Sequence, residues 1–256
     1  MKFKYTFLVV GAPILASIIP AIAADEKPPT ISRGYTLEVK PGQMAEFEAG
    51  MKKQIEWYKQ NNETWQWHAW ELETGAKTGQ FVFRSPGHYW KDIDDRSERT
   101  ARASSHFEEA VLPHLESIQG NLGRTLPDVS DWPDELGIPA MVSVHEFNLN
   151  YGRSEWFLQV IEKIHGAIQE SNWGLHYVWI TRVSGGEVPT FFLVIPHKNW
   201  ADMEGPEKPF RTMLEETLGK KEAVAVMAGL RECVRKESAA LARYRPELSY
   251  IPSGEE

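Results

Sequence analysis

Two patterns of apolar and polar residues follow one another along the chain: short strand-like stretches in which they alternate, and longer stretches in which apolar residues have helical spacing. The same order of stretches occurs twice. At residues 35–40 and 142–150, apolar and polar positions alternate, which is typical of a half-buried β-strand. After each strand, apolar residues recur every three or four positions, as on one face of a helix. These residues are Phe47, Met51 and Ile55 in the first half, and Phe157, Ile161, Ile164 and Ile168 in the second. Each helix is therefore expected to pack one apolar stripe on a flat surface.

Two aromatic-rich strands, a second helix and a short last strand complete each half. The strands are expected at residues 64–72 with 80–84, and at 175–182 with 190–195. The helices are expected at 100–118 and 221–243, and the last strands at Val129 and Leu248. The order β-α-β-β-α-β predicts the α+β class, with each half a ferredoxin-like module in which two helices cover one face of a four-stranded antiparallel sheet.

The two halves also match position by position. Residues 35–42 align with 145–152 at an offset of 110 (152 − 42), and the same offset relates Phe81 to Phe191. Trp70 is aligned with Trp179 after a slip of one residue. We interpret the collinear matches as a tandem duplication of one module, with copies that start near Tyr35 and Val142.

The second copy is longer than the first. At Pro127 and Pro246 the offset has grown to 119 (246 − 127), so nine extra residues (119 − 110) precede the end of the second copy. They are expected near residues 205–220. The inward-facing positions also differ between the copies, and we therefore expect any function on one side of the pseudo-twofold rather than equally on both.

A sheet with helices on one face leaves its other face bare, and that face is rich in aromatic residues. The run Leu37-x-Val39-x-Pro41-Gly42 with Glu46-Phe47, and the stretch Ser104-Ser105-His106-Phe107, resemble the dimeric α+β barrel superfamily. That superfamily includes the antibiotic-biosynthesis monooxygenase-like and NIPSNAP-like domains. The resemblance implies that two modules press their open faces together. Tandem copies would then form an intramolecular α+β barrel, a monomer with an internal pseudo-dimer, and a homodimer remains compatible with it.

The N-terminus has the features of a secretory signal. Lys2 and Lys4 precede an apolar run at 7–24, which contains the small-residue site Ala21-Ile22-Ala23. The alternative is an uncleaved membrane anchor; Pro13 and Pro20 favour cleavage. The expected organisation is a signal peptide at 1–23, a linker at 24–33, modules at 34–132 and 141–252 with a linker at 133–140, and a tail at 253–256. We therefore expect an exported protein, either periplasmic or extracellular, that has no stable membrane span after cleavage.

Charge and cysteine content exclude some partners and crosslinks. The formal net charge is −8, and a chain of this sign is a poor binder of nucleic acid, which needs a basic surface. Cys233 is the only cysteine, so an internal disulfide cannot form, and the residue is expected to be a small buried side chain.

Strand alternation predicts which side chains face the barrel interior. Val178 and Ile180 are assigned to the helix side, which turns Tyr177 and Trp179 inward, with His68 and Trp70 as counterparts. Thr36, Glu38, Glu146 and Asn148 also turn inward, and Arg84 is expected to pair with Glu38. The candidate pocket is lined by His68, Trp70, Tyr177, Trp179, Glu38, Arg84 and Glu146 and suits a small apolar or aromatic ligand. The alternative is that these side chains fill a solid core.

No cofactor or metal is expected. The histidines lack His-x-x-x-His spacing, and a zinc site from His68, His145 and His176 needs the fold to gather them. The resemblance implies haem held by a helix histidine in some members, and His106 is the nearest candidate, although the second copy has no equivalent.

The function expected is an exported, non-enzymatic protein that binds a small ligand or a partner. The alternative is a cofactor-independent monooxygenase-like or isomerase-like enzyme with His68 or Tyr177 as the proton-transfer group.

Overall fold

The computed structural model describes residues 28–94 and 98–252. The expected signal peptide at 1–23 and the tail at 253–256 lie outside the described residues. The first half contains β1 (Ile31–Val39), α1 (Met44–Gln60), β2 (His68–Leu72), β3 (Phe81–His88), α2 (Trp90–Ile93), α3 (Glu98–Ala110) and β4 (Leu115–Thr125). The second half contains β5 (Met141–Leu149), α4 (Ser154–Ser171), β6 (Val178–Ser184), β7 (Thr190–His197), α5 (Phe210–Leu218), α6 (Lys220–Cys233) and β8 (Val234–Tyr244). Short 3₁₀ helices lie between them, among them Pro127–Val129 and Pro246–Leu248.

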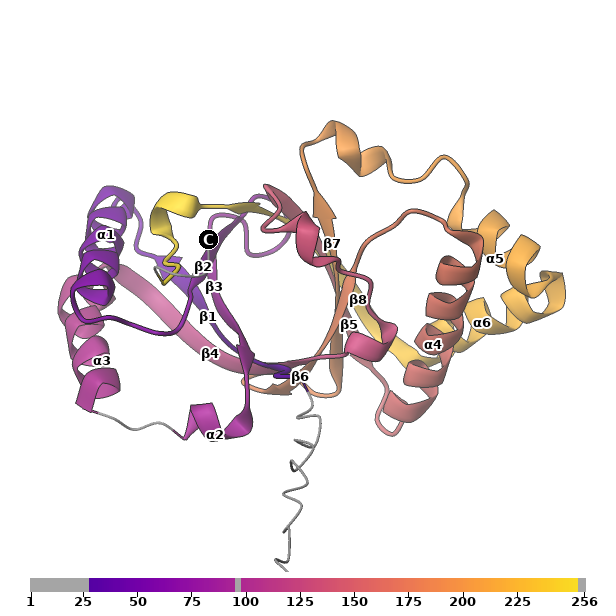
Figure 1. Ribbon diagram of the computed structural model, residues 1–256, viewed down its shortest axis with the longest axis horizontal. Helices are drawn as coiled ribbons and strands as arrows, with labels where there is room; N and C mark the ends of the chain where they lie inside the picture. Colours follow the sequence, from indigo (N-terminus) through magenta and orange to yellow (C-terminus); the bar gives the residue numbers. More distant parts are fainter. Residues whose placement is uncertain (1–27, 95–97, 253–256) are drawn as a thin grey trace, which may run out of the picture.

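The eight strands form one antiparallel sheet that closes into a barrel, in the order β1-β3-β2-β8-β5-β7-β6-β4 (Figure 1). Within the first half the strands run β4-β1-β3-β2, and within the second β8-β5-β7-β6. Two seams join the halves: β2 pairs with β8, and β4 pairs with β6. Closure removes the unpaired edges that each four-stranded sheet would expose alone.

The last strand of each half begins earlier than expected. β8 follows directly on α6, and β4 follows α3 after a short 3₁₀ helix at Leu112–His114. Val129 and Leu248 lie in 3₁₀ helices, so the expectation of helices to residues 118 and 243 was wrong. Residues such as Glu116, Ala239 and Ala240 have ordinary or high helix propensity. Pairing of β4 with β1, and of β8 with β5, overrides that local preference.

The helices lie on the outside of the barrel, α1 and α3 over one half and α4, α5 and α6 over the other (Figure 1). Phe47 and Phe157 anchor the two outer cores: each is fully buried, and each packs on a strand phenylalanine with ring centroids 4.9 Å apart. α1 and α3 pack closely at Gly50, where a Cβ atom would lie 2.1 Å from the Ala110 carbonyl oxygen. In the described part of the chain, no helix has the length and apolar character needed to cross a membrane.

Arg245 ties the end of the second half to the first. Its guanidinium forms ion pairs with Glu48 of α1 (2.5 Å), with Glu71 of β2 and with Glu247 (2.6 Å). The same group lies 5.6 Å from the centroid of the Phe81 ring. With a side chain only 18% exposed, Arg245 is the partly buried centre of an ion-pair network, which is the geometry in which such pairs contribute measurably.

We predict that Arg245→Met lowers the free energy of unfolding by about 2 kcal/mol, because it leaves partly buried carboxylates without their cation. The matched control is Arg235→Met, whose ion pair with Glu187 is half exposed on both sides. The control should change stability by less than about 0.5 kcal/mol. Urea unfolding at neutral pH measures both, and equal losses would contradict a special role for Arg245.

Candidate functional site

A cavity of about 440 Å³ lies in the first half, between helices α1 and α3 and the outer face of β1 and β3. Its walls are mainly aromatic and aliphatic, as is usual for sites that bind small organic molecules. The aromatic residues are Tyr35, Tyr58, Trp65, Trp67, Phe83, Phe107 and Tyr250. The charged residues are Arg33, Glu63 and Glu108. The cavity is therefore an aromatic-lined space outside the barrel, not within it.

Arg33 and Tyr35 of β1 form the polar part of this lining. They are two positions apart on the strand, so both side chains point toward the helices. Arg33 Nε donates a hydrogen bond to the Tyr35 hydroxyl (2.7 Å), and its guanidinium lies 5.4 Å from the Tyr35 ring centroid. Tyr35 packs in turn on Trp67, with centroids 5.8 Å apart. Among the described residues no carboxylate forms an ion pair with Arg33, so its remaining N–H groups can serve a ligand oxygen.

One wall of the cavity comes from the other half of the chain. The segment after β8 returns to the first half, where Tyr250 and Trp67 exchange backbone hydrogen bonds of 2.8 and 2.7 Å. The Tyr250 hydroxyl donates to the Glu63 carbonyl oxygen (2.8 Å). The carboxylate of Glu63 accepts hydrogen bonds from the backbone N–H groups of Thr64 and Trp65. This wall is thus held by both backbone and side-chain contacts.

Tyr58 and Gln54 lie at the helix side of the cavity. Burial raises the pKa of Tyr58 to about 12, and a hydrogen bond from Gln54 opposes part of that rise. The Gln54 amide also donates to the Ala103 carbonyl oxygen (3.2 Å) and accepts from His106 Nδ1 (2.5 Å). Gln54 therefore links α1 to α3, and Tyr58 remains a neutral phenol at ordinary pH.

The residues present do not fit a haem held by a helix histidine. His106 donates its Nδ1 proton to Gln54, stacks on Trp57 with centroids 5.9 Å apart, and does not line the cavity. His88 lies behind Trp65, stacked at 3.8 Å, and is hydrogen-bonded to Ser85. None of the histidines in the described residues lines this cavity. A haem bound in this cavity would find no histidine there to hold its iron, whereas the family resemblance implies one.

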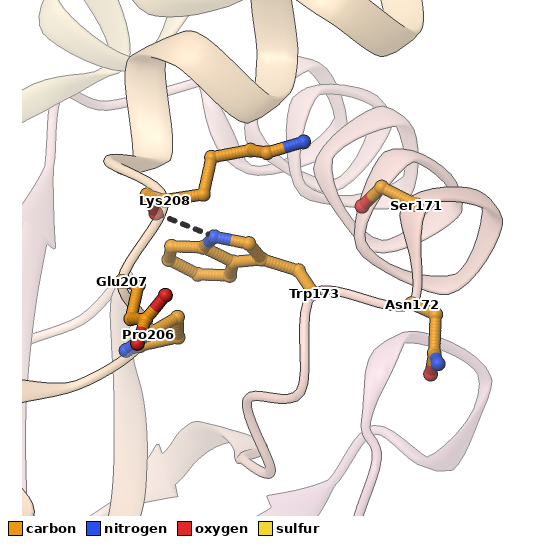
Figure 2. Close-up of a pocket in the computed structure, with 6 residues that line it drawn as sticks. All are labelled: Ser171, Asn172, Trp173, Pro206, Glu207 and Lys208. Atoms are coloured by element: carbon orange, nitrogen blue, oxygen red, sulfur yellow. Dashed lines mark hydrogen bonds between the residues drawn. The ribbon is translucent and has the colours of Figure 1, made fainter.

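The helix layer of the second half is built differently. Helix α5, which occupies the extra residues of this half, buries Met213 and Leu214 completely against α4 and α6. Near the start of this helix, Trp173 Nε1 donates to the Lys208 carbonyl oxygen (2.7 Å; Figure 2). The indole also packs on Phe210, with ring centroids 5.5 Å apart. A depression of about 300 Å³ at Ser171 and Pro206 surrounds this contact. The depression is lined by polar residues and Pro206 around one tryptophan, unlike the aromatic-lined cavity of the first half.

Tyr177 and Trp179 do not face the barrel interior, and that expectation was wrong. Trp179 packs edge-on against Phe157 of α4, and the Tyr177 hydroxyl is hydrogen-bonded to His165 of α4 (2.8 Å). The error came from the assignment of Val178 and Ile180 to the helix side, since neighbouring residues of a strand point to opposite faces. At the constant offset of 110, Tyr177 corresponds to Trp67, and both lie on the helix side.

The other candidate residues lie on the inner face of the barrel, but not with the partners expected. Glu38 accepts from Ser117 (3.0 Å), and Arg84 donates to Ser32 rather than pairing with Glu38. Glu146 forms an ion pair with Arg182 (3.3 Å). His68 and Trp70 pack on Tyr244 of β8. The seven candidates are therefore divided between the two faces of the sheet.

The three histidines considered for zinc are not gathered. His145 lies 3.6 Å from Glu237, and His176 lies 3.0 Å from Asp131. His68 instead donates from Nε2 to Gln66 (2.9 Å). Within the described residues, no group of three or more metal-binding side chains occurs.

Sequence reasoning missed the residues that line the cavity: Arg33, Tyr35, Tyr58, Trp65, Trp67 and Tyr250. One signal was available. The nine extra residues of the second half have no counterpart in the first, so the two modules differ in how their helices cover the sheet. Assignment of Leu37 to the helix side also places Arg33 and Tyr35 there, because they are two and four positions away on the same strand.

The fold is shared with several solved structures, whereas no family model and no curated protein sequence matches the chain. A candidate monooxygenase from Lactobacillus acidophilus NCFM has a TM-score of 0.53 at 11% identity, covering 89% of this chain and 97% of its own. A candidate monooxygenase from Fusobacterium nucleatum has a TM-score of 0.52 at 9% identity, covering 86% and 94%. A chlorite dismutase variant from Candidatus Nitrospira defluvii has a TM-score of 0.51 at 12% identity, covering 87% and 94%. These similarities are consistent with the superfamily expected from the sequence and, at such identities, show the fold alone.

The raised pKa of Tyr58 predicts a stability change at alkaline pH. An unfolded tyrosine ionises near pH 10, whereas the folded pKa is about 12. The contribution of Tyr58 is therefore complete below about pH 10 and is lost as the pH rises toward 12. In Tyr58→Phe, the free energy of unfolding should fall less steeply than in the wild type between about pH 10 and 12.

Urea unfolding across this pH range tests the prediction. Tyr151→Phe is the control, since the Tyr151 side chain is 98% exposed, and it should follow the wild-type slope. Parallel curves for Tyr58→Phe and the wild type would contradict the burial of the phenol.

Proposed function

We propose that the chain binds a small planar aromatic molecule in the cavity between α1, α3 and the outer face of β1 and β3. The observation that supports this is the concentration of seven aromatic side chains around about 440 Å³ in one half. In the other half, α5 adds the fully buried Met213 and Leu214 to the outer apolar core. Flat aromatic ligands gain from stacking on such walls as well as from burial.

The ligand is expected to carry a hydroxyl or carbonyl oxygen. Arg33 has N–H groups in excess of its bond to Tyr35, and it is among the few charged residues in an otherwise apolar lining. A hydrogen bond from a cation to a ligand oxygen is stronger than one between neutral groups. Arg33 would therefore orient the ring by its oxygen substituent.

A second candidate function is oxygenation of that ligand without a cofactor. The support is the Arg33 guanidinium, which can stabilise a phenolate in a poorly hydrated site, together with the fold shared with candidate monooxygenases. The phenol would give its proton to Glu108, the ring carbon para to the oxygen would bond to O₂, and loss of water would leave a quinone. For 1-naphthol the balance closes, since 1-naphthol and O₂ give 1,4-naphthoquinone and water with no external reductant.

The biological setting proposed is export to the periplasm or the exterior, supported by the charged, apolar and small-residue order of the N-terminal sequence. We also propose that the two halves arose by tandem duplication. Support comes from their matched residues and from the equivalent strand orders β4-β1-β3-β2 and β8-β5-β7-β6.

Binding is tested with 1-naphthol by isothermal titration calorimetry. Ala103 lines the cavity from α3, and Ala103→Phe should weaken binding by about tenfold or more, because the new ring occupies the ligand volume. Ala101→Phe is the matched control at an exposed position of the same helix, and it should bind as the wild type does. Equal binding by both variants would place the ligand elsewhere.

Catalysis is tested with the same probe by oxygen consumption and chromatographic detection of 1,4-naphthoquinone. Arg33→Gln should lower turnover by about a hundredfold while 1-naphthol binding changes far less, since the charge matters most for the developing phenolate. Absence of quinone with the wild-type protein rejects the oxygenase candidate and leaves the binding function standing.

A further inference from the structure

The inner face of β2 and β3 carries a second set of chemical groups, separate from the helix-side cavity. In the antiparallel register His68 faces Arg84 and Trp70 faces Val82. These four side chains point into the barrel, because Phe83, between Val82 and Arg84, lines the cavity on the opposite face. The inner face also carries several valines whose side chains remain partly exposed to solvent: Val82, Val144, Val178 and Val194. Solvent therefore reaches part of the lumen.

Arg84 is a cation in this lumen without a carboxylate partner among the described residues. Its guanidinium donates to the hydroxyl of Ser32, which is itself buried. The inner face carries two carboxylates, but Glu38 accepts a hydrogen bond from Ser117 and Glu146 forms its ion pair with Arg182. Arg84 thus carries a positive charge without an ion pair, whereas Arg182 has one.

Such a charge is costly unless something balances it. Burial, together with the neighbouring charge of Arg182, lowers the pKa of Arg84 to about 10. Arg84 thus remains protonated at neutral pH despite its surroundings. The guanidinium presents five N–H donors, and the single hydroxyl of Ser32 satisfies few of them.

His68, opposite Arg84, also has a nitrogen without a partner, although this lone pair needs a hydrogen-bond donor and is not satisfied by a carboxylate. Its Nε2 atom donates to Gln66, so Nδ1 is an acceptor, and Nδ1 is buried without a hydrogen-bond partner. Native proteins leave few buried polar atoms unpaired. The unsatisfied acceptor and the cation without an ion pair are directly opposite each other on paired strands.

We propose that Arg84, with Ser32 beside it, binds the carboxylate of a small organic acid in the barrel lumen, with the apolar part of the acid against Val82 and Trp70. A carboxylate matches the planar fork of a guanidinium and supplies a counter-charge to Arg84, which has no ion pair among the described residues. A monoacid fits better than phosphate or sulfate, because the second guanidinium is already paired and the adjacent wall is apolar.

The test is calorimetric titration with cyclohexanecarboxylate, an aliphatic acid chosen to differ from the flat aromatic probe of the outer cavity. The wild type should bind one equivalent, and Arg84→Gln should bind about tenfold or more weakly through loss of the charged hydrogen bonds. Arg124→Gln removes the same charge from an exposed position on β4 and should bind as the wild type does. Cyclohexanecarboxamide and inorganic phosphate should each bind at least about tenfold more weakly than the acid.

Thermal unfolding without ligand provides a second readout. Arg84→Gln should be at least as stable as the wild type, because it removes a part-buried charge that has no ion pair. Addition of the acid should raise the melting temperature of the wild type and of Ala103→Phe, but not that of Arg84→Gln. Retention of 1-naphthol binding by Arg84→Gln separates this site from the outer cavity.

Three outcomes would each overturn the luminal site: no binding of the acid by the wild type, equal binding by Arg84→Gln, or tighter binding of phosphate. Marked destabilisation of ligand-free Arg84→Gln would also reject it, since Arg84 would then be a satisfied structural group.

Discussion

The pairing of β2 with β8 and of β4 with β6 is the constraint on which the rest of the structure depends. A four-stranded sheet has two open edges, and each half uses both of its edges to join the other half. Once the edges are joined, the uncovered faces of the two sheets can only point into a common lumen. The helices must then lie outside, and the chain after each last strand crosses to the opposite half.

That crossing is what completes the outer cavity. The segment carrying Leu248 and Tyr250 belongs to the second half by sequence but forms a wall of a cavity in the first. Its counterpart, Asp131, forms the equivalent backbone bridge to Tyr177. The contacts of this crossing segment are therefore equivalent on both sides. The helix layers differ, since α5 adds the buried Met213 and Leu214 to the core of the second side.

The hairpin formed by β2 and β3 contributes functional side chains to both faces of the sheet. Along the chain, Trp65 and Trp67 belong to the outer cavity, whereas His68 and Trp70 face the lumen. β3 divides in the same way, with Phe83 outside and Arg84 inside. The proposed aromatic site and the proposed acid site are thus separated by one thickness of sheet, and substitutions at adjacent positions act on different sites.

The sequence by itself determined the α+β class, the order of elements in each half, the apolar stripes of α1 and α4, and the extra segment of the second half. Those features depend on local periodicity and on matched positions, which a single chain displays directly. Only the tertiary structure decided where α3 and α6 end, because strand pairing overrode the helix propensity of β4 and β8. It also decided the face of Tyr177 and Trp179. Both faces of β6 are apolar, one against α4 and the other toward the lumen, so alternation alone could not distinguish them.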